Sequence, residues 1–133
     1  MSTPGYSGKL LSVKLGLKPG SRFDVRHAPG PVGDLPEPNQ RVGPVDLLVA
    51  FFRVRADFES ELPELAERIF PNGGLWIVWP KRASGIRTDL VEQTIRDVAL
   101  PLGLVDNKVC AVDETWSGLR LVWRKARRIQ SSE

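Results

Sequence analysis

Residues 45–79 read VDLLVAFFRVRADFESELPELAERIFPNGGLWIVW, and their pattern sets the architecture of the whole chain. Residues 45–52 are almost continuously apolar, which is typical of a strand buried on both faces of a parallel sheet. Residues 75–79 have the same character and follow the turn-forming run Pro71-Asn72-Gly73-Gly74. We therefore expect two fully buried strands on either side of the intervening segment.

The segment between these strands, residues 56–70, has a helical pattern. Acidic residues gather at its start and Arg68 lies near its end, an arrangement that the helix dipole favours. Pro63 leaves two alternatives open: the helix begins with Ser60 as N-cap and Pro63 in its first turn, or an earlier piece kinks at Pro63. One apolar stripe at helical spacing comprises Phe58, Leu62, Leu65, Ala66, Ile69 and Phe70.

Upstream of this unit, the sequence predicts a short helix, a strand and a long loop. The helix is expected over 7–16, with Ser7 as N-cap and Gly16 at the left-handed position after its last turn. Residues 21–26 alternate apolar and polar side chains, which indicates a first strand. Residues 27–44 are rich in Pro and Gly and are expected to be a loop, extended near 40–42.

Downstream, Thr88 is expected to cap a helix over 89–100, with Asp89 as a partner of that helix's dipole. Residues 104–112 and 119–124 flank the turn 113–118 and predict a terminal antiparallel hairpin.

The alternation of strands and helices indicates an α/β fold. We expect a minimal three-layer structure, whose mostly parallel five-stranded sheet ends with a terminal antiparallel strand. Residues 1–124 are predicted to form a single domain, and 125–133 a basic, flexible tail.

Composition narrows the class of protein. The chain has 133 residues, with 41% hydrophobic and 26% charged residues and a net charge of +3. No apolar run approaches the roughly 20 residues of a membrane helix, and no secretory signal is visible, so we expect a cytoplasmic location. The single cysteine, Cys110, lies in an apolar run and is expected to pack as a small hydrophobic residue. No cluster has the spacing of metal ligands, so no metal is predicted.

Three runs resemble one uncharacterised bacterial family of domains of unknown function. They are G-Y-S-G at 5–8, W-P-K-R-A-S-G-I-R-T-D-L at 79–90 and V-C-A-V-D-E-T-W-S-G-L at 109–119. The resemblance covers nearly the whole chain and implies no activity.

More distantly, the order of elements from residue 45 resembles the second half of class I S-adenosylmethionine-dependent methyltransferases, which implies a methyltransferase-like, Rossmann-like sheet. In those methyltransferases, a glycine-rich turn that leads into a helix binds the cofactor. This chain has no counterpart of that turn and helix, because Gly30 and Gly33 lie among prolines and no helix follows them. We therefore expect no cofactor.

Sheets of this kind bind ligands beyond the carboxyl ends of their parallel strands. That edge is expected to hold His27 after the first strand and Arg53 after the second, together with Arg82 in the loop after the third strand. His27, the sole histidine, is either an acid or base or a loop residue without a chemical role. The candidate ligand-binding residues are Lys81, Ser84, Arg87, Asp113, Glu114, Thr115, Trp116 and Ser117.

Asp113 and Glu114 are the candidate catalytic carboxylates, with Lys81 adjusting their proton affinity or binding an anion. Alternatively, Lys81 bridges the hairpin electrostatically, while Thr115 or Ser117 shapes the turn. Trp116 is either a lid packed on Pro80 or a stacking platform for a planar ligand.

Three hypotheses on function follow. We favour a non-catalytic domain that binds a small molecule or a protein at this edge. The first alternative is a small enzyme that uses Asp113 or Glu114 with Lys81. The second is a nucleic-acid accessory protein that uses the basic ends, whose densest run is 124–128. The first strand is a free edge in this arrangement, so either loop 27–44 covers it or a homodimer forms through it.

Overall fold

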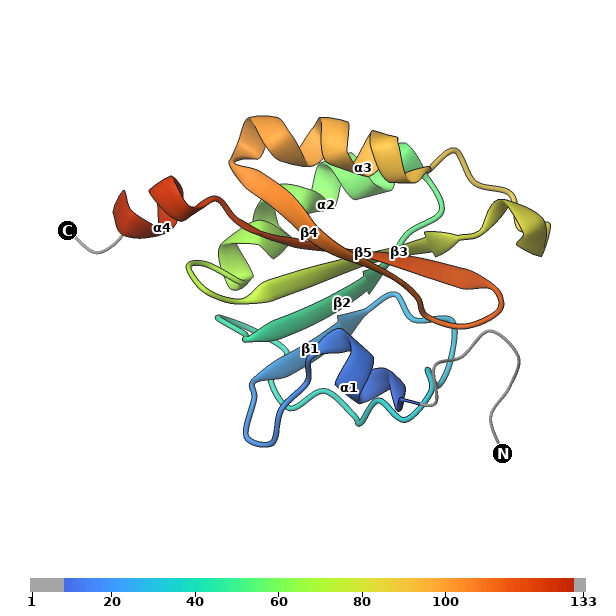
Figure 1. Ribbon diagram of the computed structural model, residues 1–133, viewed down its shortest axis with the longest axis horizontal. Helices are drawn as coiled ribbons and strands as arrows, with labels where there is room; N and C mark the ends of the chain where they lie inside the picture. The colour runs from blue at the N-terminus through green and yellow to red at the C-terminus, as the bar shows by residue number, and fades with distance from the viewer. Residues whose placement is uncertain (1–8, 131–133) are drawn as a thin grey trace.

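Three layers make up the fold, seen in a computed structural model that describes residues 9–130 (Figure 1). The expected α/β class is confirmed. The elements, in chain order, are α1 Leu11–Leu15, β1 Phe23–Arg26, β2 Leu47–Phe51, α2 Arg55–Arg68, β3 Gly74–Pro80, α3 Glu92–Ala99, β4 Leu104–Ala111, β5 Trp116–Trp123 and α4 Lys125–Gln130. Two single 3₁₀ turns, Arg82–Ser84 and Leu100–Leu102, lie beside α3 in the chain.

The central sheet has five strands in the order β1-β2-β3-β5-β4. Strands β1, β2 and β3 pair in parallel, whereas β5 runs antiparallel to both β3 and β4. Four strands therefore share one direction, and the antiparallel strand is the last in the chain, as expected. The predicted hairpin is confirmed, but β5 begins at Trp116 rather than at Leu119.

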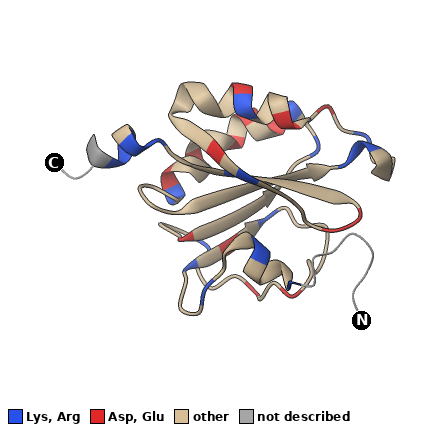
Figure 2. Ribbon diagram, viewed as in Figure 1, with Lys and Arg blue, Asp and Glu red and all other residues tan. Residues whose placement is uncertain are grey.

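Alternate side chains of the buried strands divide the core into two halves. Leu48 and Ala50 of β2 face one half, which α2 and α3 cover. Leu47 and Val49 face the other half, where α1 packs. Strands β2 and β3 carry no charged residue (Figure 2), because both of their faces are buried. The expectation of two fully buried strands is thus confirmed.

Helix α2 runs from Arg55 to Arg68 with Pro63 in its interior. The alternative in which the helix begins at Ser60 is therefore wrong. Asp89, from a distant part of the chain, explains the earlier start: its Oδ1 accepts the N–H of Arg55 at 2.7 Å. Pro63 is exposed, so its ring lies on the solvent side of the helix, away from the core.

Helix α3 begins at Glu92, later than the expected position 89. Thr88 does not cap it, because Thr88 Oγ1 donates to the carbonyl of Arg53 at 2.6 Å and accepts the N–H of Leu90 at 3.1 Å. Asp89 serves the N-terminus of α2 instead of that of α3. These bonds to the start of α2 hold residues 88–91 outside the helix.

The N-terminal helix is also shorter than expected, since α1 begins at Leu11. Ser7, the expected N-cap, lies outside the described residues. Gly16 does end the helix, with a φ of 86° that favours glycine. Trp76 of β3 donates its indole N–H to the carbonyl of Leu15 at 2.9 Å, which ties α1 to the sheet.

Loop 27–44 has no helix or strand, and the stretch near Gln40 does not join the sheet. The N–H groups of Asn39 and Gln40 donate to the carbonyl of Phe23, and the N–H of Phe23 donates to Asn39 Oδ1. The loop thus occupies the outward hydrogen-bonding groups of Phe23 in β1. A homodimer through this edge stays a prediction.

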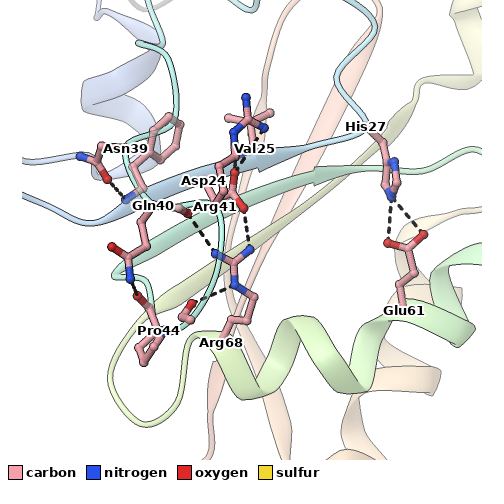
Figure 3. A network of polar contacts seen from close by, with 11 residues as sticks. Asp24, Val25, His27, Asn39, Gln40, Arg41, Pro44, Glu61 and Arg68 are labelled. Atoms are coloured by element: carbon pink, nitrogen blue, oxygen red, sulfur yellow. Dashed lines mark hydrogen bonds and ion pairs between the residues drawn. The ribbon is translucent and has the colours of Figure 1, made fainter.

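A buried ion pair holds the same loop against the sheet (Figure 3). Arg68 of α2 donates to Asp24 Oδ2 of β1 at 2.5 Å, and Asp24 is fully buried. The same guanidinium donates to the carbonyls of Gly43 and Gln40 at 2.9 and 3.0 Å. One side chain therefore links α2, β1 and the end of the loop.

The predicted tail contains α4 over Lys125–Gln130, and 131–133 lie outside the described residues. None of the helices in the described range is both long and apolar enough to cross a membrane.

Candidate functional site

A cleft of about 580 Å³ opens at the carboxyl ends of β1 and β2, which is the edge that the sequence predicts. We call it the edge cleft. Its ionisable lining residues are His27, Arg53, Asp57 and Glu61. Its apolar lining residues are Pro29, Phe51, Phe52, Val54, Ile86 and Trp116.

His27 and Glu61 form the best-defined polar contact of the edge cleft. His27 Nε2 lies 2.8 and 3.0 Å from the two carboxylate oxygens of Glu61, which projects from α2 (Figure 3). Because an ionised carboxylate only accepts hydrogen bonds, Nε2 carries the proton. The His27 backbone has a φ of 63°, a left-handed conformation that costs free energy in a residue other than glycine. Glu61 and the ring of Phe52, in an edge contact at 5.6 Å, hold the imidazole in place.

Aromatic side chains form the apolar wall of the edge cleft. Trp116 and Phe51 meet edge to face, with ring centroids 5.2 Å apart. Phe52 makes a similar contact with Phe58 of α2 at 5.7 Å. Phe51 and Phe52 are almost fully buried, whereas Trp116 is half-buried. Trp116 therefore presents the most accessible aromatic surface of the wall.

Arg53 and Asp57 carry the remaining charges of the lining. The carbonyl of Arg53 accepts bonds from Thr88 Oγ1 and from the N–H of Asp89, which brings Ile86 to the same cleft. Within residues 9–130, neither the Arg53 guanidinium nor the Asp57 carboxylate makes an ion pair or a side-chain hydrogen bond. Both side chains are exposed.

Of the eight predicted ligand-binding residues, Trp116 lines the edge cleft. The sequence leaves two alternatives for Trp116: it packs on Pro80 as a lid, or it is a platform on which a planar ligand stacks. Trp116 pairs with Pro80 through the backbone register of β3 and β5, while its ring packs against Phe51. The other seven are not among the residues that line this cleft: Lys81, Ser84, Arg87, Asp113, Glu114, Thr115 and Ser117.

Asp113 and Thr115 shape the hairpin turn. Asp113 Oδ1 accepts the N–H groups of Thr115 and Trp116, both at 2.8 Å. The N–H of Lys81 donates to the carbonyl of Thr115 at 2.8 Å, which joins the two predicted loops through their backbones. In the described part of the chain, no ion pair links Lys81 to Asp113 or Glu114, so the expected electrostatic bridge is replaced by this backbone bond.

The remaining predicted residues have structural or exposed positions. Ser84 Oγ donates to the carbonyl of Lys81 at 2.7 Å and accepts the N–H of Ile86 at 3.1 Å. Ser117 lies within β5, opposite Trp79. Arg82, Arg87 and Glu114 are exposed. As candidate binding or catalytic residues they stay predictions.

Sequence reasoning misses Asp57 and Glu61, because acidic residues at the start of a helix are explained by the helix dipole alone. The two lie four residues apart on α2 and so share a helix face. The signal that places them at the site is the position of this helix directly after β2, since its first turns must lie at the carboxyl edge of that strand.

A second hollow of about 520 Å³ lies under loop 27–44 and shares His27 with the edge cleft. Val25, Val32 and Leu35 contribute to its apolar lining. Loop 27–44 thus forms most of the walls of this second hollow.

Cys110 is half-buried against the α1 side of the core. Burial raises the pKa of its thiol, despite the opposing effect of Lys14 and Lys108, which disfavours a reactive thiolate. Residues 9–130 hold no group of three His, Cys, Asp or Glu side chains arranged to bind a metal ion.

A scan against protein-family models matched no family, and a search of curated proteins found no significant match. The function must therefore be inferred from the chemistry of the site itself.

Proposed function

We propose that the protein binds a small organic molecule in the edge cleft and does not alter it. The observation that carries this proposal is one cleft, at the carboxyl edge of parallel strands, that is lined by both aromatic and ionisable side chains. Ligand sites in open α/β sheets occur at this edge, and a volume of about 580 Å³ is ordinary for a small-molecule site.

The state of His27 supports this proposal. An unfavourable backbone conformation persists only where the surroundings hold it, and such residues cluster at functional sites. Here Glu61 of α2 and Phe52, the residue directly after β2, provide that support. The imidazole is therefore oriented before a ligand arrives, which lowers the entropy lost on binding.

The proposal extends to the origin of the fold. The chain is a degenerate methyltransferase-like domain within an uncharacterised bacterial family. The order strand, helix, strand, helix and hairpin from β2 to β5 supports this likeness. Loop 27–44 stands where a cofactor-binding turn and helix would be needed, which favours a ligand other than S-adenosylmethionine.

A fragment screen tests the binding function. Ligand-observed NMR identifies fragments that bind the full chain, and backbone amide shifts then locate them. We expect hits that shift residues around His27 and Trp116 and that bind Trp116→Ala about fivefold more weakly, since stacking on an aromatic ring contributes roughly 1 kcal/mol.

Glu114→Ala is the matched control, because Glu114 is exposed in the neighbouring turn and does not line the edge cleft. It should bind the same fragments as the wild type. Hits that map elsewhere, or that bind all three proteins equally, contradict the proposal.

A second candidate is an enzyme that uses His27 and Glu61 for proton transfer. The specific observation is an imidazole oriented by both oxygens of a carboxylate at the border of the edge cleft. The residues described as lining this cleft include no Ser, Thr, Cys or Lys, so the lining offers no hydroxyl, thiol or amine side chain as a nucleophile. Asp113, a catalytic carboxylate expected from the sequence, is less favoured for this role. Its Oδ1 already accepts hydrogen bonds from two backbone N–H groups.

Mass spectrometry of a bound fragment after long incubation distinguishes the two functions. Conversion that His27→Gln abolishes without loss of binding favours the enzyme, and an unchanged fragment favours binding. Nucleic-acid binding through the basic termini is tested separately by a mobility shift at low salt.

A further inference from the structure

Two opposite charges in the edge cleft lack partners within the described chain. Arg53 lies two residues before the start of α2, and Asp57 lies in the first turn of that helix. Both side chains line the same hollow without forming an ion pair with each other. Elsewhere in α2, the charged groups near this end are paired: Arg55 bonds Glu59 at 2.7 Å, and Glu61 bonds His27.

We infer that the ligand of the edge cleft is a zwitterionic α-amino acid with a large apolar side chain. This inference rests on the proposed binding function and specifies its ligand. An unpaired guanidinium and an unpaired carboxylate, both facing one hollow, are complementary to a ligand that carries a carboxylate and an ammonium group.

The guanidinium of Arg53 binds the ligand's carboxylate. A guanidinium presents a planar fork of donors that matches two carboxylate oxygens. The N-terminus of α2 already holds the Asp89 carboxylate, which accepts the N–H of Arg55 at 2.7 Å, so the Arg53 guanidinium is the group that binds the ligand's carboxylate.

The carboxylate of Asp57 accepts hydrogen bonds from the ligand's ammonium group. Glu61 is engaged with His27 through both of its oxygens, so Asp57 is the acid of the lining that is available for a cation. An ammonium group has three donors and can bond one carboxylate while keeping contact with water.

The aromatic wall receives the ligand's side chain. Trp116, half-buried and packed edge to face on Phe51, offers an apolar surface beside the charged groups. Ile86 continues this surface on the loop after β3. A side chain the size of phenylalanine fits the cleft volume of about 580 Å³.

The test compares three related compounds by isothermal titration calorimetry at pH 7.5: L-phenylalanine, phenethylamine, which lacks the carboxylate, and 3-phenylpropionate, which lacks the ammonium group. We expect L-phenylalanine to bind about fivefold or more tightly than either analogue, since each charge pair is partly screened by water. Glycine, which lacks the apolar side chain, should bind more weakly as well.

Two variants assign the charges. Arg53→Gln should remove the advantage of L-phenylalanine over phenethylamine and keep its advantage over 3-phenylpropionate. Asp57→Asn should do the converse. Glu64→Gln, an exposed acid of the same helix that does not line the edge cleft, is the control and should bind all compounds as the wild type does. Thermal melts establish that each variant is folded.

An analogue that binds as tightly as the amino acid, or a preference that persists in both variants, overturns the zwitterion proposal. If fragments still bind at the edge cleft while L-phenylalanine does not, the ligand class is wrong and the binding function stands. If nothing binds there, both proposals fail.

Discussion

Replacing Arg68 with methionine tests whether the buried ion pair organises loop 27–44. Methionine keeps much of the length and apolar stem of arginine and removes the guanidinium. The change breaks the bond to Asp24 Oδ2 at 2.5 Å and leaves that carboxylate in a fully buried position. It also removes the donors that the carbonyls of Gly43 and Gln40 accept.

The expected loss of stability is large, because the remaining charge has little compensation. Removing one partner of a buried ion pair lowers the free energy of unfolding by about 3–5 kcal/mol. Asp24 retains the N–H of Val25 at 2.8 Å and the Arg41 guanidinium at 3.8 Å. Since Arg41 is exposed, we expect a value near the lower end, about 3 kcal/mol.

Urea denaturation followed by circular dichroism measures this difference. Arg55→Met is the matched control, since Arg55 lies on the same helix and pairs with Glu59, with both side chains close to half exposed. The control should lose much less stability than Arg68→Met, because water screens an exposed ion pair. The double variant Asp24→Leu/Arg68→Met should recover most of the lost stability, because it leaves no unpaired buried charge.

A loss of less than about 1 kcal/mol for Arg68→Met refutes the reasoning, because a buried carboxylate without its partner should lower the free energy of unfolding by more than that. Equal losses for Arg68→Met and Arg55→Met refute it too, since burial is the property that separates the two pairs.

Three further changes test individual contacts. Gly73→Ala should lower the free energy of unfolding by about 1–3 kcal/mol, since its Cβ would stand 2.8 Å from the Val45 carbonyl oxygen; in urea denaturation, Gly30→Ala, whose Cβ meets nothing within 4 Å, should lose much less. Asp113→Ala should destabilise the hairpin by about 1 kcal/mol and Asp113→Asn by less, because the amide oxygen still accepts the two backbone bonds; equal losses would contradict a turn-shaping role. The Ser12 hydroxyl and N–H lower the pKa of Asp34, so this carboxylate stabilises the fold fully above the ordinary aspartate pKa of about 3.9, and that stability is lost as pH falls through the lowered value. Stability measured against pH should therefore fall less steeply below about pH 4 in Ser12→Ala, and an unchanged slope would count against this contact.

Much of the architecture was predictable from local patterns. The apolar runs at 45–52 and 75–79, the stripe from Phe58 to Ile69 and the turn at Gly73 each depend on neighbours in the chain. Their identification as strands, helix and turn is confirmed by the structure. The rule that places ligands at the carboxyl edge of parallel strands also led to the region of His27, Arg53 and Trp116.

The starts of the helices were not predictable in the same way. Thr88 and Asp89 have the residue types of a cap, and local reasoning assigns them to the helix that follows. In the structure both bond the segment at Arg53 to Arg55, more than thirty positions away in the chain. Capping preference states which residue types accept such bonds, whereas the fold decides which N–H groups reach them.

The amino-acid sequence alone determined the element types, the α/β class and the edge of the sheet at which the edge cleft opens, because hydrophobic periodicity and turn chemistry act between near neighbours. Tertiary structure alone decided which charged groups meet. His27 and Glu61 are 34 positions apart, and Asp24 and Arg68 are 44 apart. No periodicity relates residues at such separations; their contact follows from how α2 crosses the sheet and lies beside β1 and its loop.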